Sequence, residues 1–82
     1  MKFDVKLWGG LVPLADGQKT VEVEAKTIRE LLRKLSDRYP GLAGPIKGDV
    51  AVAVDGTIWR DDWSQPLPEG AEIYLMRRLP GG

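Results

Sequence analysis

The chain has 82 residues, of which 43% are hydrophobic and 29% are charged, and its formal net charge is zero. A chain of this length forms one domain that buries about 60% of its unfolded surface, and neutral charge gives no global attraction to nucleic acid or anionic membranes. The absence of Cys and His excludes disulfides, thiolate metal sites and cysteine nucleophiles, and removes the commonest general base. The composition therefore favours a binding protein, or a substrate of other enzymes, over an enzyme.

The location of the protein is expected to be cytoplasmic. The longest uninterrupted apolar run, residues 50–54, is far too short to cross a membrane. Residue 1 leads directly into a strand-like pattern, without the apolar core of a signal peptide. We therefore expect neither a membrane partner nor a nucleic-acid partner.

The first quarter of the chain predicts a β-hairpin. Residues 2–8 alternate polar and apolar side chains, which is typical of a strand with one buried face. Gly9 and Gly10 end this strand. After a turn region the alternation returns over residues 20–25, so the two strands are expected to pair.

A helix is predicted to begin after Thr27. Apolar residues then recur at helical spacing, at Ile28, Leu31, Leu32, Leu35 and Tyr39, and the first four of them are assigned to the core. Thr27 and Glu30 match a capping box, in which the hydroxyl and the carboxylate each accept a hydrogen bond from a backbone N–H at the helix start. Pro40 ends the helix, because proline has no N–H and clashes with the preceding turn.

The second half of the chain predicts three strands. After a Gly/Pro-rich loop, residues 49–54 form a strand, and an Asp-Gly turn leads into a short strand at 57–59. Residues 60–71 are expected to be irregular, and residues 72–77 form the last strand. The order β-β-α-β-β-β predicts an α+β fold of the β-grasp (ubiquitin-like) type, with one main helix on one face of a mixed sheet of four to five strands.

The third and last strands are apolar on both faces. If their Val, Ile and Leu residues face the helix, the open face of the sheet carries Ala51, Ala53, Tyr74 and Met76. We expect these four residues to form a shallow apolar patch that binds a partner. The alternative is that this face is covered by Trp59, Trp63 or the long 60–71 loop. Trp8 and these two residues are candidates either for interface anchors or for core packing.

The whole chain resembles the MoaD/ThiS family of ubiquitin-like sulfur carriers, and its length is closer to MoaD. The resemblance is carried by the hairpin, the helix TIRELLRKLSDRYPGL, the segments VAVDG and PLPEGAEIYLM, and the final Gly81-Gly82. It implies a β-grasp domain over residues 1–77, followed by a flexible tail at 78–82. It also implies a protein without a catalytic site of its own.

The resemblance further implies that Gly82 is the reacting residue. In this family an adenylyltransferase of the ubiquitin-activating type, MoeB- or ThiF-like, uses ATP to convert the carboxylate of the last glycine into an acyl-adenylate and then into a thiocarboxylate. The sulfur passes to a MoaE-like molybdopterin synthase subunit or, in a ThiS-like carrier, to a ThiG-like thiazole synthase. The carrier binds no cofactor, since the ATP belongs to the partner. Gly81 is expected to help the tail thread a narrow channel, because glycine has no Cβ.

The four residues before the glycines, Arg77, Arg78, Leu79 and Pro80, are expected to contact the partner. Many family tails have small, uncharged residues at these positions. The basic residues here are instead similar to those that precede the terminal Gly-Gly of ubiquitin. The two arginines either bind an acidic groove or solvate the end of the strand. Fully extended, Leu79 to Gly82 would reach about 13–14 Å.

Two other functions remain open at this point. One is a noncatalytic ubiquitin-like interaction module that uses the open sheet face. The other is a protein modifier, joined through Gly82 to lysines of other proteins. Asp61-Asp62 is interpreted as an exposed turn rather than a cation site, because no further ligands lie nearby in the sequence.

Overall fold

The five strands of the computed structural model form one mixed sheet, with the order β2-β1-β5-β3-β4. The strands are β1 (Lys2–Leu7), β2 (Thr20–Glu24), β3 (Val50–Val54), β4 (Thr57–Trp59) and β5 (Ile73–Arg77). β1 and β5 run parallel, whereas the other neighbouring pairs run antiparallel. The structure describes residues 2–77, so the predicted tail at 78–82 lies outside the described residues. The predicted β-grasp fold is confirmed, and every strand begins and ends within one residue of its predicted bounds.

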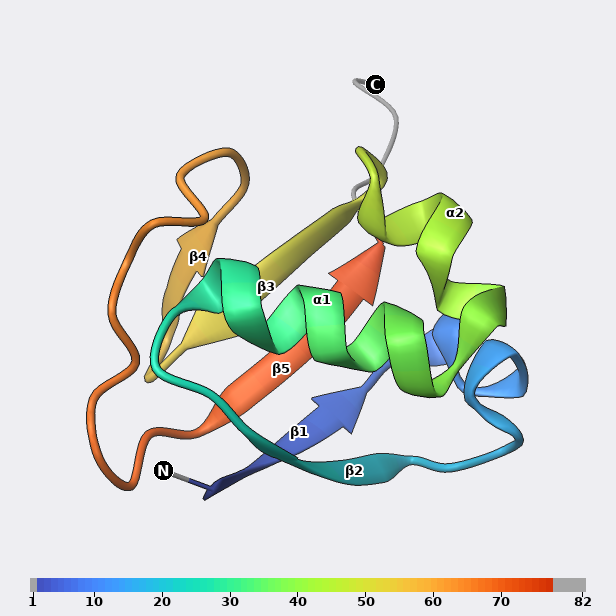
Figure 1. Cartoon of the computed structure of the whole chain (residues 1–82), viewed down its shortest axis with the longest axis horizontal. Helices are drawn as coiled ribbons and strands as arrows, with labels where there is room; N and C mark the ends of the chain where they lie inside the picture. Colours follow the sequence, from blue (N-terminus) through green and yellow to red (C-terminus); the bar gives the residue numbers. More distant parts are fainter. Residues whose placement is uncertain (1, 78–82) are drawn as a thin grey trace.

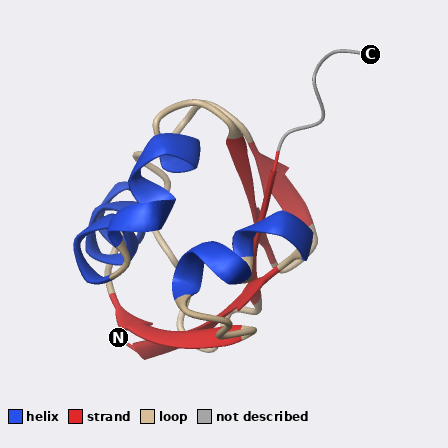
Figure 2. Cartoon of the chain, turned by 90° about the vertical axis from the view of Figure 1, so that its right-hand side faces the viewer, coloured by secondary structure: helices blue, strands red, loops and turns tan. Residues whose placement is uncertain are grey.

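The main helix, α1 (Ile28–Arg38), crosses one face of this sheet (Figure 1). Its predicted core residues are buried against the strands: Ile28, Leu31, Leu32 and Leu35. Figure 2 shows the helix and the sheet as two layers, with the opposite side of β3 and β5 left open. The core therefore lies between α1 and one face of the sheet, as the two hydrophobic periodicities predict.

The predicted capping box forms with one difference. The Thr27 hydroxyl accepts a hydrogen bond from the Glu30 N–H at 3.2 Å, as expected. The Glu30 carboxylate accepts from the N–H of Lys26 at 2.7 Å, one residue before the cap rather than at the cap itself. The carboxylate thereby also fixes the segment that joins β2 to α1.

The irregular segment between β4 and β5 completes the start of α1. Ile28 donates its N–H to the carbonyl of Gln65 at 3.1 Å, and Arg29 donates to the carbonyl of Trp63 at 2.8 Å. Helix N-termini leave such donors without partners inside the helix. The 60–71 segment therefore packs on the helix side of the sheet and occupies the end of α1 that would otherwise attract anions.

Two segments predicted as loops contain short helices. They are η1 (Gly9–Leu11), η2 (Pro13–Ala15), η3 (Pro40–Leu42) and α2 (Ala43–Ile46). The prediction of irregular loops was wrong here, because Leu11, Ala15 and Leu42 are fully buried and add to the core. The short helices close one end of the space between sheet and helix.

Candidate functional site

The open face of the sheet brings together the four residues predicted for partner binding. Ala51 lies opposite Met76, and Ala53 lies opposite Tyr74, in the ladder between β3 and β5. Ala53 also faces Ile58 of β4. The two alanines are buried although no helix covers them, whereas Tyr74 and Met76 are half-buried. Small residues between larger ones produce a shallow apolar floor with higher rims.

The rims of this floor are the most exposed large apolar side chains in the described part of the chain. Trp8 is 55% exposed and Ile58 is 51% exposed. The Trp8 ring meets the Tyr74 ring edge-on, with centroids 5.6 Å apart. The Lys6 ammonium lies 5.2 Å from the centroid of the Tyr74 ring, within the range of a cation–π interaction. We call Ala51, Ala53, Ile58, Tyr74, Met76 and Trp8 the open-face patch.

Sequence reasoning missed Ile58 and Lys6. Ile58 stands in a short strand after the Asp-Gly turn, and an apolar residue there faces the same side as Ala53 only once the β3–β4 register is known. The alternation within residues 2–8 placed Lys6 on the open face, but its contact with Tyr74 depends on the parallel pairing of β1 and β5. Both contacts are long-range in sequence, so local patterning gives no signal for them.

The alternative of a covered open face is wrong. Trp59 and Trp63 are partly buried against the core cluster, which does not include Ala51 or Ala53. The hydrogen bonds of the 60–71 segment to α1 place that segment on the helix side as well. Of the three tryptophans, Trp8 alone reaches the open face, so it is the one suited to anchor an interface.

Arg77 is the first of the four residues before the terminal glycines that were predicted to contact a partner, and it is the last residue that the structure describes. Its guanidinium donates to the Oδ2 atom of Asp49 through Nε at 3.2 Å and through Nη2 at 2.5 Å. Both side chains are about half exposed. Arg77 is thus paired within its own fold. The other predicted site residues, Arg78, Leu79, Pro80, Gly81 and Gly82, lie outside the described residues.

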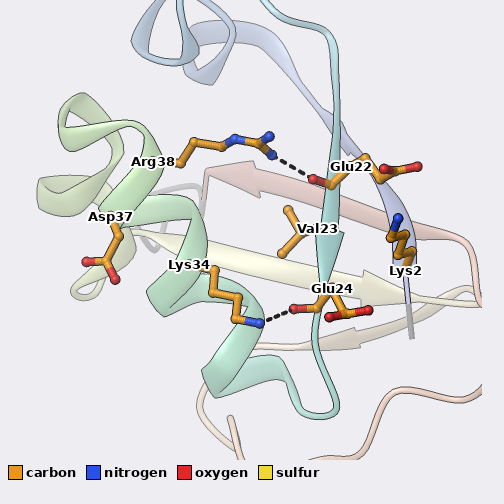
Figure 3. Close-up of a pocket in the computed structure, with 7 residues that line it drawn as sticks. All are labelled: Lys2, Glu22, Val23, Glu24, Lys34, Asp37 and Arg38. Atoms are coloured by element: carbon orange, nitrogen blue, oxygen red, sulfur yellow. Dashed lines mark hydrogen bonds between the residues drawn. The ribbon is translucent and has the colours of Figure 1, made fainter.

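A groove of about 500 Å³ separates β2 from α1. Figure 3 shows that Lys34 and Arg38 reach from α1 to the backbone of β2. The Lys34 ammonium donates to the carbonyl of Glu24 at 2.7 Å, and the Arg38 guanidinium donates to the carbonyl of Glu22 at 2.7 Å. These cations are engaged by the edge strand, so the groove is a protected sheet edge rather than a ligand site.

The Asp61-Asp62 turn organises a loop. The Asp62 carboxylate accepts hydrogen bonds from the Ser64 hydroxyl and the Gln65 amide, both at 2.5 Å, and from the Ser64 N–H at 3.2 Å. These bonds, with Arg29 nearby, hold the pKa of Asp62 below its ordinary value. All three bonds are local, so the carboxylate shapes the turn that presents carbonyl groups to α1.

Residues 2–77 contain neither a metal-binding cluster nor a membrane-spanning helix. Within them no three Asp, Glu, His or Cys side chains come close enough to hold a metal ion. No helix in the same range is long and apolar enough to span a membrane. No charged residue among them is buried. The features that stand out are surfaces: the open-face patch and the end of β5.

Comparisons with known proteins agree with this fold. The model of the ThiS family matches residues 5–82. No curated protein matches the chain. The small archaeal modifier protein 1 from Methanosarcina acetivorans has a similar structure, with a TM-score of 0.78, 23% identity, and coverage of 99% of this chain and 96% of that chain.

Two solved complexes contain chains of the same shape. One is the complex of subunits 1 and 2 of the molybdopterin-converting factor from Helicobacter pylori, with a TM-score of 0.69, 24% identity and full coverage of both chains. The other is the BexX/CysO complex from Amycolatopsis orientalis, with a TM-score of 0.80, 18% identity, and coverage of 98% of this chain and 99% of that one. At these identities the likeness shows the fold, and each of the two structures is a complex between two different proteins.

Proposed function

This chain belongs to the ThiS family, and on that premise we propose that it is a ubiquitin-like sulfur carrier activated at Gly82 by a partner enzyme. The observation that carries the proposal is the extent of the family match, which runs from residue 5 through residue 82 and so includes Gly81-Gly82. The protein is then a co-substrate of an ATP-dependent adenylyltransferase rather than an enzyme.

The proposed chemistry takes place on one carboxylate. The Gly82 carboxylate attacks the α-phosphorus of ATP and displaces pyrophosphate, which leaves an acyl-adenylate. Sulfide then attacks the acyl carbon and displaces AMP. An enzyme persulfide can do the same, and a thiol then cleaves the acyl disulfide that forms, leaving a disulfide on the enzyme. The product is a thiocarboxylate whose sulfur can be transferred to an acceptor. Glycine suits this position because it has no Cβ to shield the acyl carbon.

The folded body supplies recognition in this proposal. The open-face patch combines a small-residue floor with aromatic and aliphatic rims, which is the composition of interface cores. Five residues follow Arg77, and a fully extended chain of that length reaches about 16–18 Å. The body can therefore dock outside an active site while Gly82 reaches the reacting phosphate within it.

The partners follow from the same proposal. We take the activating enzyme to be of the MoeB/ThiF type and the sulfur acceptor to be MoaE-like. The likeness to the Helicobacter pylori complex supports this acceptor, since that complex joins subunits 1 and 2 of a molybdopterin-converting factor. A ThiG-like thiazole synthase is the alternative acceptor, supported by the family match itself.

A protein modifier is the second candidate function. The likeness to the small archaeal modifier protein 1 supports it, as does the Arg77-Arg78 approach to the terminal glycines. Its signature is an isopeptide bond between Gly82 and a lysine of another protein. Both functions begin with the same adenylation, so they differ in the nucleophile that attacks Gly82.

The experiment that tests the proposal is ATP–pyrophosphate exchange with the adenylyltransferase of the same organism. Wild type is compared with a variant that lacks Gly81 and Gly82. We expect exchange with wild type and none with the truncated variant, although the truncated variant still binds the enzyme through its open-face patch. Equal binding without exchange by either protein would instead indicate a noncatalytic interaction module.

A further inference from the structure

The point at which the chain leaves the sheet is tied by side chains. Val50 and Arg77 form the last pair of the β3–β5 ladder. Asp49 precedes this pair and binds the Arg77 guanidinium through two donors, Nε at 3.2 Å and Nη2 at 2.5 Å. The ion pair thus joins the first turn before β3 to the last residue of β5, just beyond the backbone ladder.

The Arg77 side chain also passes close to Gly10 of η1. A Cβ built on Gly10, which has none, would lie 3.9 Å from the Cδ atom of Arg77. The turn that contains Gly10 is fixed to the same strand, because Trp8 donates its N–H to the carbonyl of Leu75 at 3.1 Å. The Arg77 side chain therefore runs between η1 and Asp49.

The location of the Asp49–Arg77 ion pair suggests a role other than stabilising the fold. Ion pairs between half-exposed side chains contribute little to folding, because solvent screens them and both side chains lose freedom. Asp49 and Arg77 nevertheless sit where the last five residues begin. If they separate, the final rung of β5 can fray, and more residues must be ordered when Gly82 enters an active site.

We propose that Asp49 is a positioning residue for the activation of Gly82, acting through Arg77 to fix the point and direction from which residues 78–82 start. The inference rests on the proposed function. It differs from a role in which Arg77 binds an acidic partner. In the positioning role the pair acts as a unit, whereas in the partner role Asp49 competes with the partner for Arg77.

The two roles predict opposite effects of Asp49→Asn. If Arg77 binds the partner, freeing it leaves activation unchanged or improves it. If the pair positions the chain, the variant docks normally but presents Gly82 less often. The kcat of adenylation should then fall about three- to tenfold. KM should be nearly unchanged, because the entropy lost in ordering the end of the chain is lost after the body has docked. Asp37→Asn is the matched control, since it removes one exposed carboxylate of α1 that forms no ion pair with Arg77.

The charge-swapped double variant, Asp49→Arg with Arg77→Asp, separates the roles again. Positioning predicts that the swap restores most of the kcat lost in Asp49→Asn. Binding of Arg77 to an acidic partner predicts that the swap is as poor as Arg77→Asp alone. Heteronuclear NOE values at the Met76 and Arg77 amides supply a readout independent of activity, and they should fall in Asp49→Asn and recover in the swap.

Each outcome decides the proposal. Normal kcat and unchanged NOE values in Asp49→Asn, with active wild type, would overturn the positioning role and leave the sulfur-carrier function standing. A swap that fails to recover would also overturn it. Wild type that is never adenylated would overturn both proposals, and this result is distinguished because the wild-type reaction is measured first.

Discussion

At the scale of single residues, Gly41 shows how a short turn is fixed by the absence of a side chain. A Cβ at this position would lie 3.0 Å from the backbone carbonyl oxygen of Leu14, closer than nearly all real contacts. The Gly41 backbone of η3 therefore packs directly against Leu14 of η2. A backbone oxygen has little room to move, so the approach requires glycine.

We predict that Gly41→Ala lowers the free energy of unfolding by about 1–3 kcal/mol, the usual cost of overpacking. Urea denaturation measures this. Gly48→Ala is the matched control, since no atom lies within 4 Å of its Cβ position, and we expect a change below about 0.5 kcal/mol. Equal stability of the two variants would contradict the close approach of η2 and η3.

Asp62 provides a test by pH. Its pKa is lowered mainly because the Ser64 hydroxyl donates to the carboxylate. A lowered folded-state pKa contributes stability above the unfolded-state value of about 3.9, and this contribution is lost as pH falls through the folded-state pKa. NMR titration of the Asp62 carboxyl carbon should give a midpoint below that value.

The Ser64→Ala variant should raise this midpoint toward the ordinary value. Ser36→Ala is the control, because the Ser36 hydroxyl donates to the carbonyl of Arg33 elsewhere in the fold. The same midpoint in Ser64→Ala and wild type would show that the hydroxyl does not stabilise the Asp62 carboxylate.

Residue-scale partners were the least predictable from sequence. Alternation within strands was enough to assign Ala51, Ala53, Tyr74 and Met76 to one face. The pairing of Asp49 with Arg77 was not predicted, because 28 residues separate them and neither belongs to a local motif. Arg77 was therefore predicted either to bind an acidic groove or to solvate the end of the strand, and its ion pair with Asp49 was missed.

At the scale of elements, β2 and α1 share a feature that no prediction contained. β2 is an edge strand, and its outward carbonyls recur every second residue, about 6.6–6.8 Å apart. Lys34 and Arg38 are one helical turn apart, about 5.4–6 Å, and their long side chains absorb the difference. Two successive carbonyls are thus bound by two successive turns of the helix (Figure 3).

Removing both cations should expose this edge to pairing with a second copy. We predict that Lys34→Met with Arg38→Met self-associates at lower concentration than wild type, because an unprotected edge strand pairs readily. Each lost hydrogen bond should also lower stability by about 0.5–1.5 kcal/mol. Sedimentation velocity over a concentration series measures the association.

The control for this prediction is Arg33→Met with Lys47→Met, which removes two exposed cations and adds the same side chains away from the edge. Association of both double variants to the same extent would attribute the effect to charge and hydrophobicity alone. That result would refute a protective role of Lys34 and Arg38.

Long elements were predicted well because their periodicity is averaged over many residues. α1, β1 and β2 carry clear 3.6-residue or two-residue repeats. β3 and β5 are recognised as continuous apolar runs, and β4 by the Asp-Gly turn before it. The short helices η1, η2, η3 and α2 have only three or four residues each, in segments rich in Gly and Pro. Such segments are typical of loops, and only the burial of Leu11, Ala15 and Leu42 shows that they close the core.

At the scale of the whole molecule, the sheet has two apolar faces with different roles. One face packs on α1 and holds the fold together. The other carries the open-face patch, whose exposed rims stability does not require. Apolar surface left open in this way is typical of a binding surface. The reacting residue of the proposed function, Gly82, follows the last strand by five positions in the sequence, so recognition and chemistry are assigned to different parts of the chain.

We predict that Ile58→Lys weakens binding to the activating enzyme at least tenfold, equivalent to about 1.4 kcal/mol, because it places a charge in the patch. Ile58 is 51% exposed, so the fold should tolerate the change. Thr20→Lys adds the same charge to the same sheet face at the β2 edge and serves as control. Isothermal titration calorimetry measures both affinities, and wild-type affinity in Ile58→Lys would exclude the patch from the interface.

The most direct test of the carrier function is the mass of the intact protein after incubation with ATP, a sulfide source and the cognate adenylyltransferase. Replacement of one carboxylate oxygen by sulfur should add about 16 Da to wild type, and fragmentation should place this gain on Gly82. A variant lacking Gly82 should gain nothing. An unchanged wild-type mass, with the enzyme active on another carrier, would contradict sulfur carriage by this chain.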